Sequence, residues 1–563
     1  MPCAYVSATV KLVFQSLFVS TVILVAEMIT SVSGQTRPSY HITPETKWMN
    51  DPQRVLFLSG KWHLYYLWNS DWDKSNPGAG GTEWYHVTST NMVQWTRQGV
   101  AIEKYQPNPS SGLILGDIES GSSVVDKANT SGFGQNAVVA VLTQMADGIQ
   151  QQSLFYSTDM GYTFTAFGGN PVMPNPDPDN KPAFRDPKII WDENAGHWVA
   201  ALAEGSYIGF YTSPDLKTWT FISTFSPVAS GIDLGILECP DLYQLDLDGD
   251  PETRVWILTL SANGYLHGKT TGTVYWFGTW NGTTFRATAS SPQWLDEGPD
   301  FYATVSWENP DNRFGSRYAI GWMNNWEYAN GLPYYGDFEG QQSLVREIKY
   351  QTVKGIPRLI SLPISEYESV FGSPVRVNGT EITTDPATAS LPTGLRGGAY
   401  VIRATVSKGD SDDGNLVYFR IKSDGTSNTT IGYDFANTEL FLLRNSDGFA
   451  SDSLAPGPKQ VWDARRSIPT NQPRTASGAN GDAACDHYHR YEDDLDLLVK
   501  YGARAYRFSL SGSRIISLGG RNDPINEGGI AFYHRLIDGL LARGIKPWVT
   551  LYHLDLPQSL QYI

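Results

Sequence analysis

The sequence predicts a mainly β protein: a five-bladed β-propeller, a second β domain after it, and an α/β segment near the carboxy end. Three observations predict this. From residue 40 to about 345, short apolar runs alternate with Gly, Pro, Asn and Asp and show no helical periodicity, which is typical of strands joined by turns. A polar turn followed by an aromatic residue recurs about every 60 residues. After about residue 460, helical spacing alternates with short apolar runs.

Composition argues against a disordered chain, a nucleic-acid-binding protein and a zinc or redox protein. The chain has 563 residues, 13% of them aromatic and 18% charged, which indicates a globular chain and not a disordered one. The net charge is -16 and no Lys/Arg-rich block is present, so nucleic acid and anionic membranes are poor partners. A neutral polar ligand such as a sugar is compatible. The three cysteines, Cys3, Cys239 and Cys485, form no CxxC pair, which argues against a zinc or redox site.

The amino end predicts a secretory signal over residues 1–34. Lys11 is followed by an apolar stretch from Leu12 to Ala26, and Val32-Ser33-Gly34 offers small residues for a cut near Gln35. The alternative is a membrane anchor, but the run is short for a spanning helix of about 20 residues. We therefore expect a secreted protein with no membrane partner once the signal is removed. Four Asn-x-Ser/Thr sequons fit a secreted glycoprotein: Asn129, Asn281, Asn378 and Asn428.

The recurring turn predicts the propeller over residues 40–345. Its copies begin at Ser89, Ser157, Ser213 and Thr279, and each leads within a few residues to Trp or Phe. A radial array of four-stranded blades produces such a recurrence, and about 60 residues per blade gives five blades. The alternative is a large β-sandwich with coincidental turns.

Residues 346–455 remain strand-like and predict a second all-β domain, a sandwich, with strands over 399–406 and 416–421. The later segment predicts a helix from Glu492 to Tyr501 ending at Gly502, and a strand over 503–510. A second helix over 526–543, capped by Gly544, and a strand over 545–552 follow. Strand, helix and strand with short links form a βαβ unit.

Three segments place a carboxylate within two residues of Pro at the start of an apolar run: Asp51 in WMNDPQ, Asp186 in FRDPK and Glu238 in LECPDL. The first strands of propeller blades line the central channel, so these acids could converge there. Retaining glycosidases use two carboxyls about 5–5.5 Å apart, as nucleophile and as acid/base. Arg185 would keep Asp186 ionised. Asp before Pro is also common in turns, so one such segment alone would carry little weight.

The three motifs, in this order, closely resemble glycoside hydrolase family 32, which contains invertases, inulinases, levanases and fructosyltransferases. The resemblance covers about residues 44–455. It also includes the segments Trp84-Tyr85-His86, residues 121–126 (GSSVVD) and residues 320–323 (IGWM).

This resemblance implies a propeller carrying a β-sandwich, and a retaining enzyme acting on sucrose, inulin or levan. Asp51 would be the nucleophile, Glu238 the acid/base and Asp186 the transition-state stabiliser. Four further residues match positions lining the fructose pocket: Asn50, Trp84, Ser122 and Arg185. No metal or organic cofactor is implied. Two alternatives stay open, a fructosyltransferase with the same residues and a non-catalytic fructan-binding protein.

The chain departs from the family pattern at three places. Leu67 stands where many members have Gln, and Gln53-Arg54 stands where Asn-Gly is usual. A late Ser/Val/Glu strand of the sandwich has no counterpart, so we expect a truncated sandwich. Cys239, beside Glu238, is interpreted as a small packing residue.

Residues 461–563 resemble a different family, glycoside hydrolase family 1, the β-glucosidases, in three segments: 481–491, 506–509 and 551–557. The resemblance implies only the first units of a (β/α) barrel. Both catalytic glutamates of that family would lie later in its chain, and Leu554 stands where Trp is usual. The segment is either a genuine second domain or the product of two joined coding regions, and we favour the second interpretation.

Overall fold

The computed structural model forms two compact units, Met1–Asn471 and Gln472–Ile563, which are described separately. The residues that the structure describes are 3–9, 22–26, 37–76, 80–179, 183–263, 271–296, 298, 300–324, 326, 329, 337–353, 355–377, 400–405, 416–422, 428–434, 439–445, 463–467, 487–511, 515 and 525–551.

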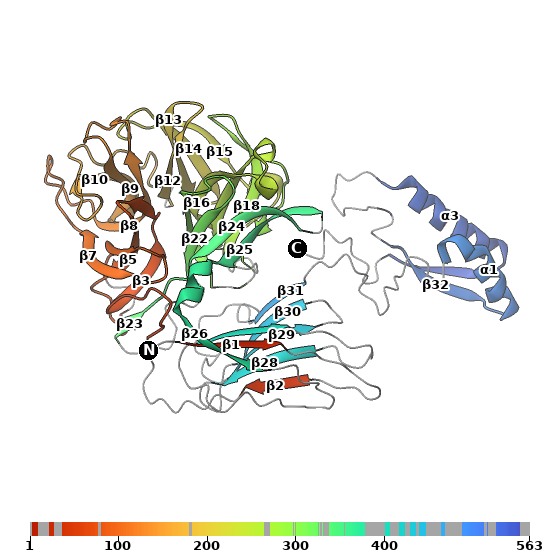
Figure 1. The fold of residues 1–563 in the computed structure, drawn as a ribbon. Coiled ribbons are helices and arrows are strands. Elements are labelled where there is room, and N and C mark those ends of the chain that lie inside the picture. Colours follow the sequence, from red (N-terminus) through yellow and green to blue (C-terminus); the bar gives the residue numbers. More distant parts are fainter. Residues whose placement is uncertain are drawn as a thin grey trace. The chain divides into compact units, whose positions relative to one another are not determined.

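Five sheets follow one another along the first unit and form the blades of a propeller (Figure 1). Blade 1 contains β3 (Lys47–Pro52), β4 (Leu56–Leu58), β5 (Lys61–Asn69), β6 (Glu83–Ser89) and β7 (Thr96–Ile102). Blade 2 contains β8 (Asp117–Asp126), β9 (Ala137–Ala146), β10 (Ile149–Ser157) and β11 (Thr165–Ala166). Blade 3 contains β12 (Arg185–Asp192), β13 (His197–Glu204), β14 (Tyr207–Ser213) and β15 (Thr220–Phe225).

Blade 4 contains β16 (Ile236–Leu245), β17 (Val255–Asn263), β18 (Thr271–Trp280), β19 (Phe285–Ala287) and β20 (Gln293–Trp294). Blade 5 contains β21 (Tyr302–Glu308), β22 (Arg317–Trp322), β24 (Arg346–Val353) and β25 (Ile356–Pro363). Short 3-10 helices lie at Val228–Ser230, Leu247–Gly249, Pro251–Thr253 and Ser365–Val370. The prediction of a five-bladed propeller is confirmed, and the large sandwich is excluded for this region.

The propeller extends beyond the boundary that we expected at residue 345. β24 and β25 are the third and fourth strands of blade 5, so residues 346–363 belong to the propeller and not to the following domain. The sequence did not reveal this because the recurring turn is missing in blade 5. There, a long connection separates β22 from β24.

The recurring turn lies between the third and fourth strands of blades 1 to 4. In blade 1, Asn91 Oδ1 accepts hydrogen bonds from the backbone N–H groups of Val93 (3.0 Å) and Gln94 (2.9 Å). In blade 3, Asp215 Oδ1 accepts from Lys217 N and Thr218 N in the same way. A short polar side chain at this point satisfies the backbone of the turn, which explains the repeat.

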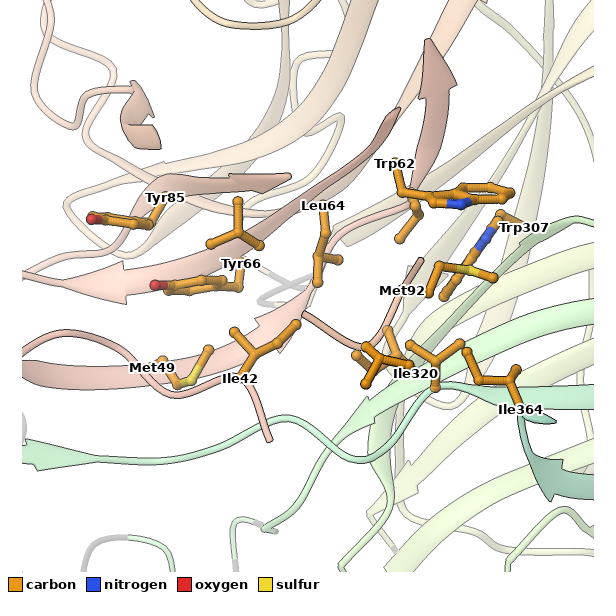
Figure 2. Packing of buried hydrophobic residues seen from close by; sticks show 14 of the residues in the cluster. Ile42, Met49, Trp62, Leu64, Tyr66, Tyr85, Met92, Trp307, Ile320 and Ile364 are labelled. Atoms are coloured by element: carbon orange, nitrogen blue, oxygen red, sulfur yellow. The ribbon is translucent and has the colours of Figure 1, made fainter. Parts of the chain in front are cut away.

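The ring closes between blades 1 and 5. β23 (Phe338–Glu339), from the connection after β22, pairs in parallel with β3. Figure 2 shows the buried side chains that pack between these blades, including Trp62, Leu64 and Tyr66 from β5 against Trp307 and Ile320. The intervening residues of β5, Tyr65 and Leu67, belong to a second core shared with blade 2. Both faces of β5 are therefore buried, which explains its continuous apolar sequence.

Two further sheets combine strands that follow the propeller in the chain with two strands that precede it. One contains β26 (Phe371–Val377), β1 (Cys3–Thr9) and β27 (Tyr400–Thr405). The other contains β2 (Val22–Ala26), β28 (Leu416–Lys422), β29 (Asn428–Asp434), β30 (Glu439–Asn445) and β31 (Asp463–Ser467). β1 and β2 lie inside the segment that we expect to be a secretory signal, so a cut near Gln35 would remove both strands from these sheets.

The second unit contains α1 (His487–Lys500), β32 (Ala505–Ser509), α3 (Glu527–Ala542) and β33 (Lys546–Thr550). β32 and β33 pair in parallel across α3, as the βαβ pattern predicts. Asn526 caps α3 by accepting from the N–H groups of Gly528 and Gly529, and Gly544 has φ +70° just after the helix. Among the described residues, no helix is long and apolar enough to cross a membrane.

Candidate active site

The inner strands of all five blades share one irregularity. In β3, β8, β12, β16 and β21, the pairing with the second strand skips two residues. The skipped pairs are Asn50–Asp51, Glu119–Ser120, Asp186–Pro187, Cys239–Pro240 and Ala303–Thr304. Such β-bulges redirect side chains and are common at active sites. The sequence-predicted acids therefore lie in or beside equivalent bulges.

Strained backbone marks three of these bulges. Asp186, Cys239 and Ala303 have φ values of 61°, 47° and 50°, a left-handed conformation that costs non-glycine residues free energy. Outliers of this kind cluster at functional sites, where surrounding structure holds them in place. The bulges of blades 3, 4 and 5, near the starts of the inner strands, therefore mark the candidate site.

Asp51 and Asp186 meet at Cys239. The thiol Sγ lies 3.7 Å from Asp51 Oδ2 and 3.7 Å from Asp186 Oδ2, and the Cys239 N–H donates to Asp186 Oδ2 at 3.1 Å. Ser120 Oγ donates to Asp51 Oδ2 at 2.7 Å. All four side chains are buried. Two carboxyls from blades 1 and 3 therefore share one donor from blade 4.

Glu238 is held by two donors. Arg185 Nη2 lies 2.8 Å from Glu238 Oε1, and the Tyr302 hydroxyl donates to Glu238 Oε2. Arg185 Nε is also 4.0 Å from Asp186 Oδ2. The guanidinium therefore connects two of the three acids, as its place beside Asp186 in the sequence suggested.

Burial dominates the electrostatics of the two aspartates. Burial, with the nearby charges of Asp186 and Glu238, raises the pKa of Asp51 to about 7, against the lowering effects of the hydrogen bonds from Ser120 and Cys239. Burial also raises the pKa of Asp186 to about 6, although Arg185 opposes it. Burial and the surrounding carboxylates raise the pKa of the Cys239 thiol well above its ordinary value, so the thiol stays neutral.

Of the four residues expected to line a fructose pocket, two contact the acids and two contact other parts of the blades. Asn50 Nδ2 donates to Asp51 Oδ1 at 3.2 Å, and Arg185 reaches Glu238. Trp84 is fully buried, and its indole N–H donates to Glu119 O at 2.9 Å. Ser122 Oγ accepts from Ile189 N at 2.8 Å, which ties blade 2 to blade 3. The structure thus brings Ser120, and not Ser122, into contact with Asp51.

Sequence reasoning did not single out Ser120, Tyr302 or Glu119, and it assigned only packing to Cys239. Tyr302 begins the inner strand of blade 5, and Ser120 lies in the bulge of blade 2, so both could have been found by aligning the five inner strands. Cys239 also packs with aromatic residues, including Trp48 and Trp322, so its packing role is real but incomplete.

The departure at Gln53-Arg54 has a structural explanation. Gln53 is fully buried, donates to Asp51 O at 3.0 Å and accepts from Gly121 N at 2.8 Å, which joins the bulges of blades 1 and 2. Arg54 Nη2 lies 2.8 Å from both carboxyl oxygens of Glu308 in blade 5, and Nη1 donates to Ile189 O in blade 3. Gln53 and Arg54 therefore connect the inner strands of different blades, which the shorter Asn-Gly pair could not reach.

Comparisons with known proteins show similarity to glycosyl hydrolases. Residues 41–363 match the family model described as "Glycosyl hydrolases family 32 N-terminal domain", and residues 456–563 match "Glycosyl hydrolase family 1". The levanbiose-producing levanase of Bacillus subtilis (strain 168) is 43% identical over 377 residues, 66% of this chain and 68% of the relative. That of Geobacillus stearothermophilus is also 43% identical, over 363 residues, 63% of this chain and 86% of the relative.

Solved structures show the same fold. Exo-inulinase from Aspergillus awamori superposes with a TM-score of 0.58 at 24% identity, covering 77% of this chain and 86% of that one. Fructofuranosidase from Schwanniomyces occidentalis superposes with a TM-score of 0.59 at 22% identity, covering 81% and 87%. The family model covers most of the propeller and the identity to the levanases is high over two thirds of the first relative, so the chain belongs to glycosyl hydrolase family 32.

Proposed function

We propose that the protein is a secreted, retaining glycosidase that cleaves terminal β-fructofuranosyl linkages of sucrose and fructans. One observation carries the proposal: Asp51 and Asp186 share the thiol of Cys239, while Glu238 is held by Arg185 beside them. Three carboxyls from three inner strands therefore surround one space. A pair of carboxyls with a third acid is what a retaining mechanism requires.

In the first step, Asp51 Oδ attacks the anomeric carbon of the fructosyl unit. The new C–O bond forms as the bond to the leaving sugar breaks, and Glu238 gives its proton to the departing oxygen. Asp186, next to the anomeric carbon, stabilises the positive charge that develops there. Asp51 attacks only when ionised, so its raised pKa sets the lower pH limit of the reaction.

In the second step, Glu238 takes a proton from water, and the water oxygen attacks the anomeric carbon of the fructosyl–Asp51 ester. The ester bond breaks, Asp51 regains its charge, and fructose leaves with its original configuration. Arg185 and the Tyr302 hydroxyl keep Glu238 in one orientation during both steps.

Levan is the substrate that the relatives favour. The two relatives at 43% identity are levanbiose-producing levanases, whereas the exo-inulinases are 30–31% identical and invertase 2 of Saccharomyces cerevisiae is 34% identical. We therefore propose levan first, and release of a difructose as a second candidate for the product. Secretion is proposed from the apolar amino-terminal segment and from relatives named extracellular exo-inulinase.

The proposed function is tested by incubating the purified protein with sucrose, inulin and levan, and by measuring free fructose, glucose and difructose by chromatography. We expect fructose or difructose from levan, and equal glucose and fructose from sucrose. Fructose that falls short of glucose at high sucrose would instead establish a fructosyltransferase. Binding of levan without any product, in both the wild type and Asp51→Asn, would establish a fructan-binding protein.

A further inference from the structure

We propose that Glu119 is a substrate-binding residue that hydrogen-bonds a hydroxyl group of the sugar retained by the enzyme. This inference rests on the proposed function. Glu119 occupies the bulge of blade 2, together with Ser120, whose hydroxyl donates to Asp51 at 2.7 Å. The equivalent bulges of blades 1, 3 and 4 hold or adjoin the three acids that surround the fructosyl unit. A fourth carboxyl therefore lies at the same end of the channel.

The backbone and one carboxyl oxygen of Glu119 are fixed by neighbours. The Trp84 indole N–H donates to Glu119 O at 2.9 Å, and Gln150 Nε2 lies 3.5 Å from Glu119 Oε2. Gln150 is itself fixed, because its Oε1 accepts from Phe184 N at 3.0 Å, immediately before Arg185. A long side chain held in this way is preorganised for a ligand, which lowers the entropy cost of binding.

The carboxyl group of Glu119 has no structural ion pair with the residues that the structure describes. The cation that faces it, Arg185, is engaged with Glu238 at 2.8 Å. Glu119 is half-buried, so part of its side chain is accessible to solvent. A few convergent polar groups of this kind in a concave site provide orientation and specificity for a ligand.

The neighbour of Glu119 decides which sugar it contacts. Ser120, the next residue in the same bulge, donates its hydroxyl to Asp51, the proposed nucleophile for the fructosyl unit. We therefore place the contact of Glu119 on the fructosyl unit that stays on the enzyme, or on a further sugar attached to it.

The protonation state of Glu119 determines the kind of hydrogen bond. Burial, together with the charges of Asp117 on the same strand, Asp186 on β12 and Asp51 on β3, raises its pKa to about 8, although Arg185 opposes the rise. Below that pH the protonated carboxyl can donate to a sugar oxygen and also accept from a hydroxyl. A carboxylate can only accept, so binding should weaken at higher pH.

The test compares KM and kcat of wild type, Glu119→Gln and Glu119→Ala for sucrose and levan between pH 5 and 9.5. For Glu119→Ala we expect KM to rise about tenfold, the usual effect of removing one good hydrogen bond to a substrate, with a smaller change in kcat. For Glu119→Gln we expect KM within about threefold of wild type at pH 6, because the amide also donates and accepts. Above pH 8, KM should rise in the wild type and stay level in Glu119→Gln.

Glu103→Gln is the matched control. Glu103 is an exposed glutamate just after β7 in blade 1, so this substitution should leave KM unchanged.

A larger rise in KM of Glu119→Ala for levan than for sucrose would place the contact at a second sugar. Equal rises for the two substrates would place it at the fructosyl unit. Both support the proposal. If KM of Glu119→Ala matches the wild type, or if Glu119→Ala does not fold and Glu119→Gln keeps the alkaline rise, the proposal is overturned. An inactive wild type would instead refute the proposed function.

Discussion

The thiol of Cys239 lies 3.7 Å from Oδ2 of Asp51, between that carboxyl and Asp186. Its raised pKa keeps the proton on sulfur, so the thiol is a neutral donor placed between two acids. The contact lowers the pKa of Asp51 and of Asp186 against the stronger effect of burial. Cys239 therefore favours the ionised form of the two aspartates that the proposed mechanism requires to be charged.

This relationship predicts the effect of Cys239 variants on the pH profile. Cys239→Ala removes a donor that favours the charged form of Asp51, so the acid limb of kcat/KM should move to higher pH, by roughly half a unit to one unit. Cys239→Ser keeps a donor, and its limb should stay close to that of the wild type. Initial rates of fructose release from pH 3.5 to 8 measure both. A limb at the same pH in Cys239→Ala would show that the thiol only fills space.

Asp51→Asn should abolish turnover and stabilise the fold at neutral pH. The folded-state pKa of about 7 lies above the ordinary value of 3.8, so the folded protein binds more protons than the unfolded chain between these values. The stability that this proton provides is present below pH 4 and is lost as pH rises to about 7. The variant cannot ionise, so we expect a gain on the order of 2 kcal/mol at pH 7.5 and almost none at pH 4. Thermal unfolding at the two pH values measures this difference.

Glu238→Gln should separate substrates by their leaving groups. The variant can still form the ester with Asp51, but it cannot give a proton to a departing sugar. Sucrose hydrolysis should fall by at least about a hundredfold, whereas a fructoside with an activated aryl leaving group should lose much less. Single-turnover rates on both substrates provide the comparison. Equal losses would assign Glu238 a role other than acid and base.

The sequence allowed much of this site to be predicted, for a physical reason. Pro187 and Pro240 and the acids beside them interrupt regular pairing at the start of inner strands, so each bulge leaves a local signal in the sequence. Ser120 has no proline or motif acid beside it, and its partner Asp51 is 69 residues away, so an alignment of the five inner strands would be needed to single it out. The same holds for Tyr302, which contacts Glu238 from the inner strand of blade 5. The end of the propeller at residue 363 was missed because blade 5 lacks the polar turn.

Arg54 provides a test of the closed ring. Its guanidinium lies 2.8 Å from both oxygens of Glu308, beside the buried pair of Lys188 and Asp241, whose Nζ and Oδ1 atoms are 2.8 Å apart. Among the described residues, Arg54→Met leaves Glu308 with Arg317 as its ion-pair partner, at 3.7 Å. The Glu308 side chain is 36% exposed, so water compensates part of the loss and we expect the fold to be destabilised by about 1–3 kcal/mol. Chemical denaturation measures the loss.

Glu308 also predicts the direction of the pH effect on this network. Arg54 and Arg317 lower the pKa of Glu308, so the stabilisation is present above its ordinary pKa and is lost as pH falls through the lowered one. The double variant Arg54→Met with Glu308→Gln removes both charges and should recover part of the stability at neutral pH. No recovery would mean that Arg54 acts mainly through its bond to Ile189 O.

The last prediction concerns residues 472–563, which form the second unit. Its two described strands pair only with each other, and β33 leaves Trp548 and Val549 exposed at 58% and 39%, with Leu551 just after it exposed at 79%. A two-stranded sheet covered by helices on one side buries too little apolar area for a stable domain. The catalytic glutamates implied by the resemblance to family 1 fall outside residues 461–563, so we expect these residues by themselves to have no β-glucosidase activity. A protein that ends after residue 471 keeps β31 paired with β30 and should release fructose from sucrose at the wild-type rate, with less aggregation in light scattering. If the shortened protein stays folded by circular dichroism but loses activity, the second unit is part of the enzyme and is not an unrelated fragment joined to it.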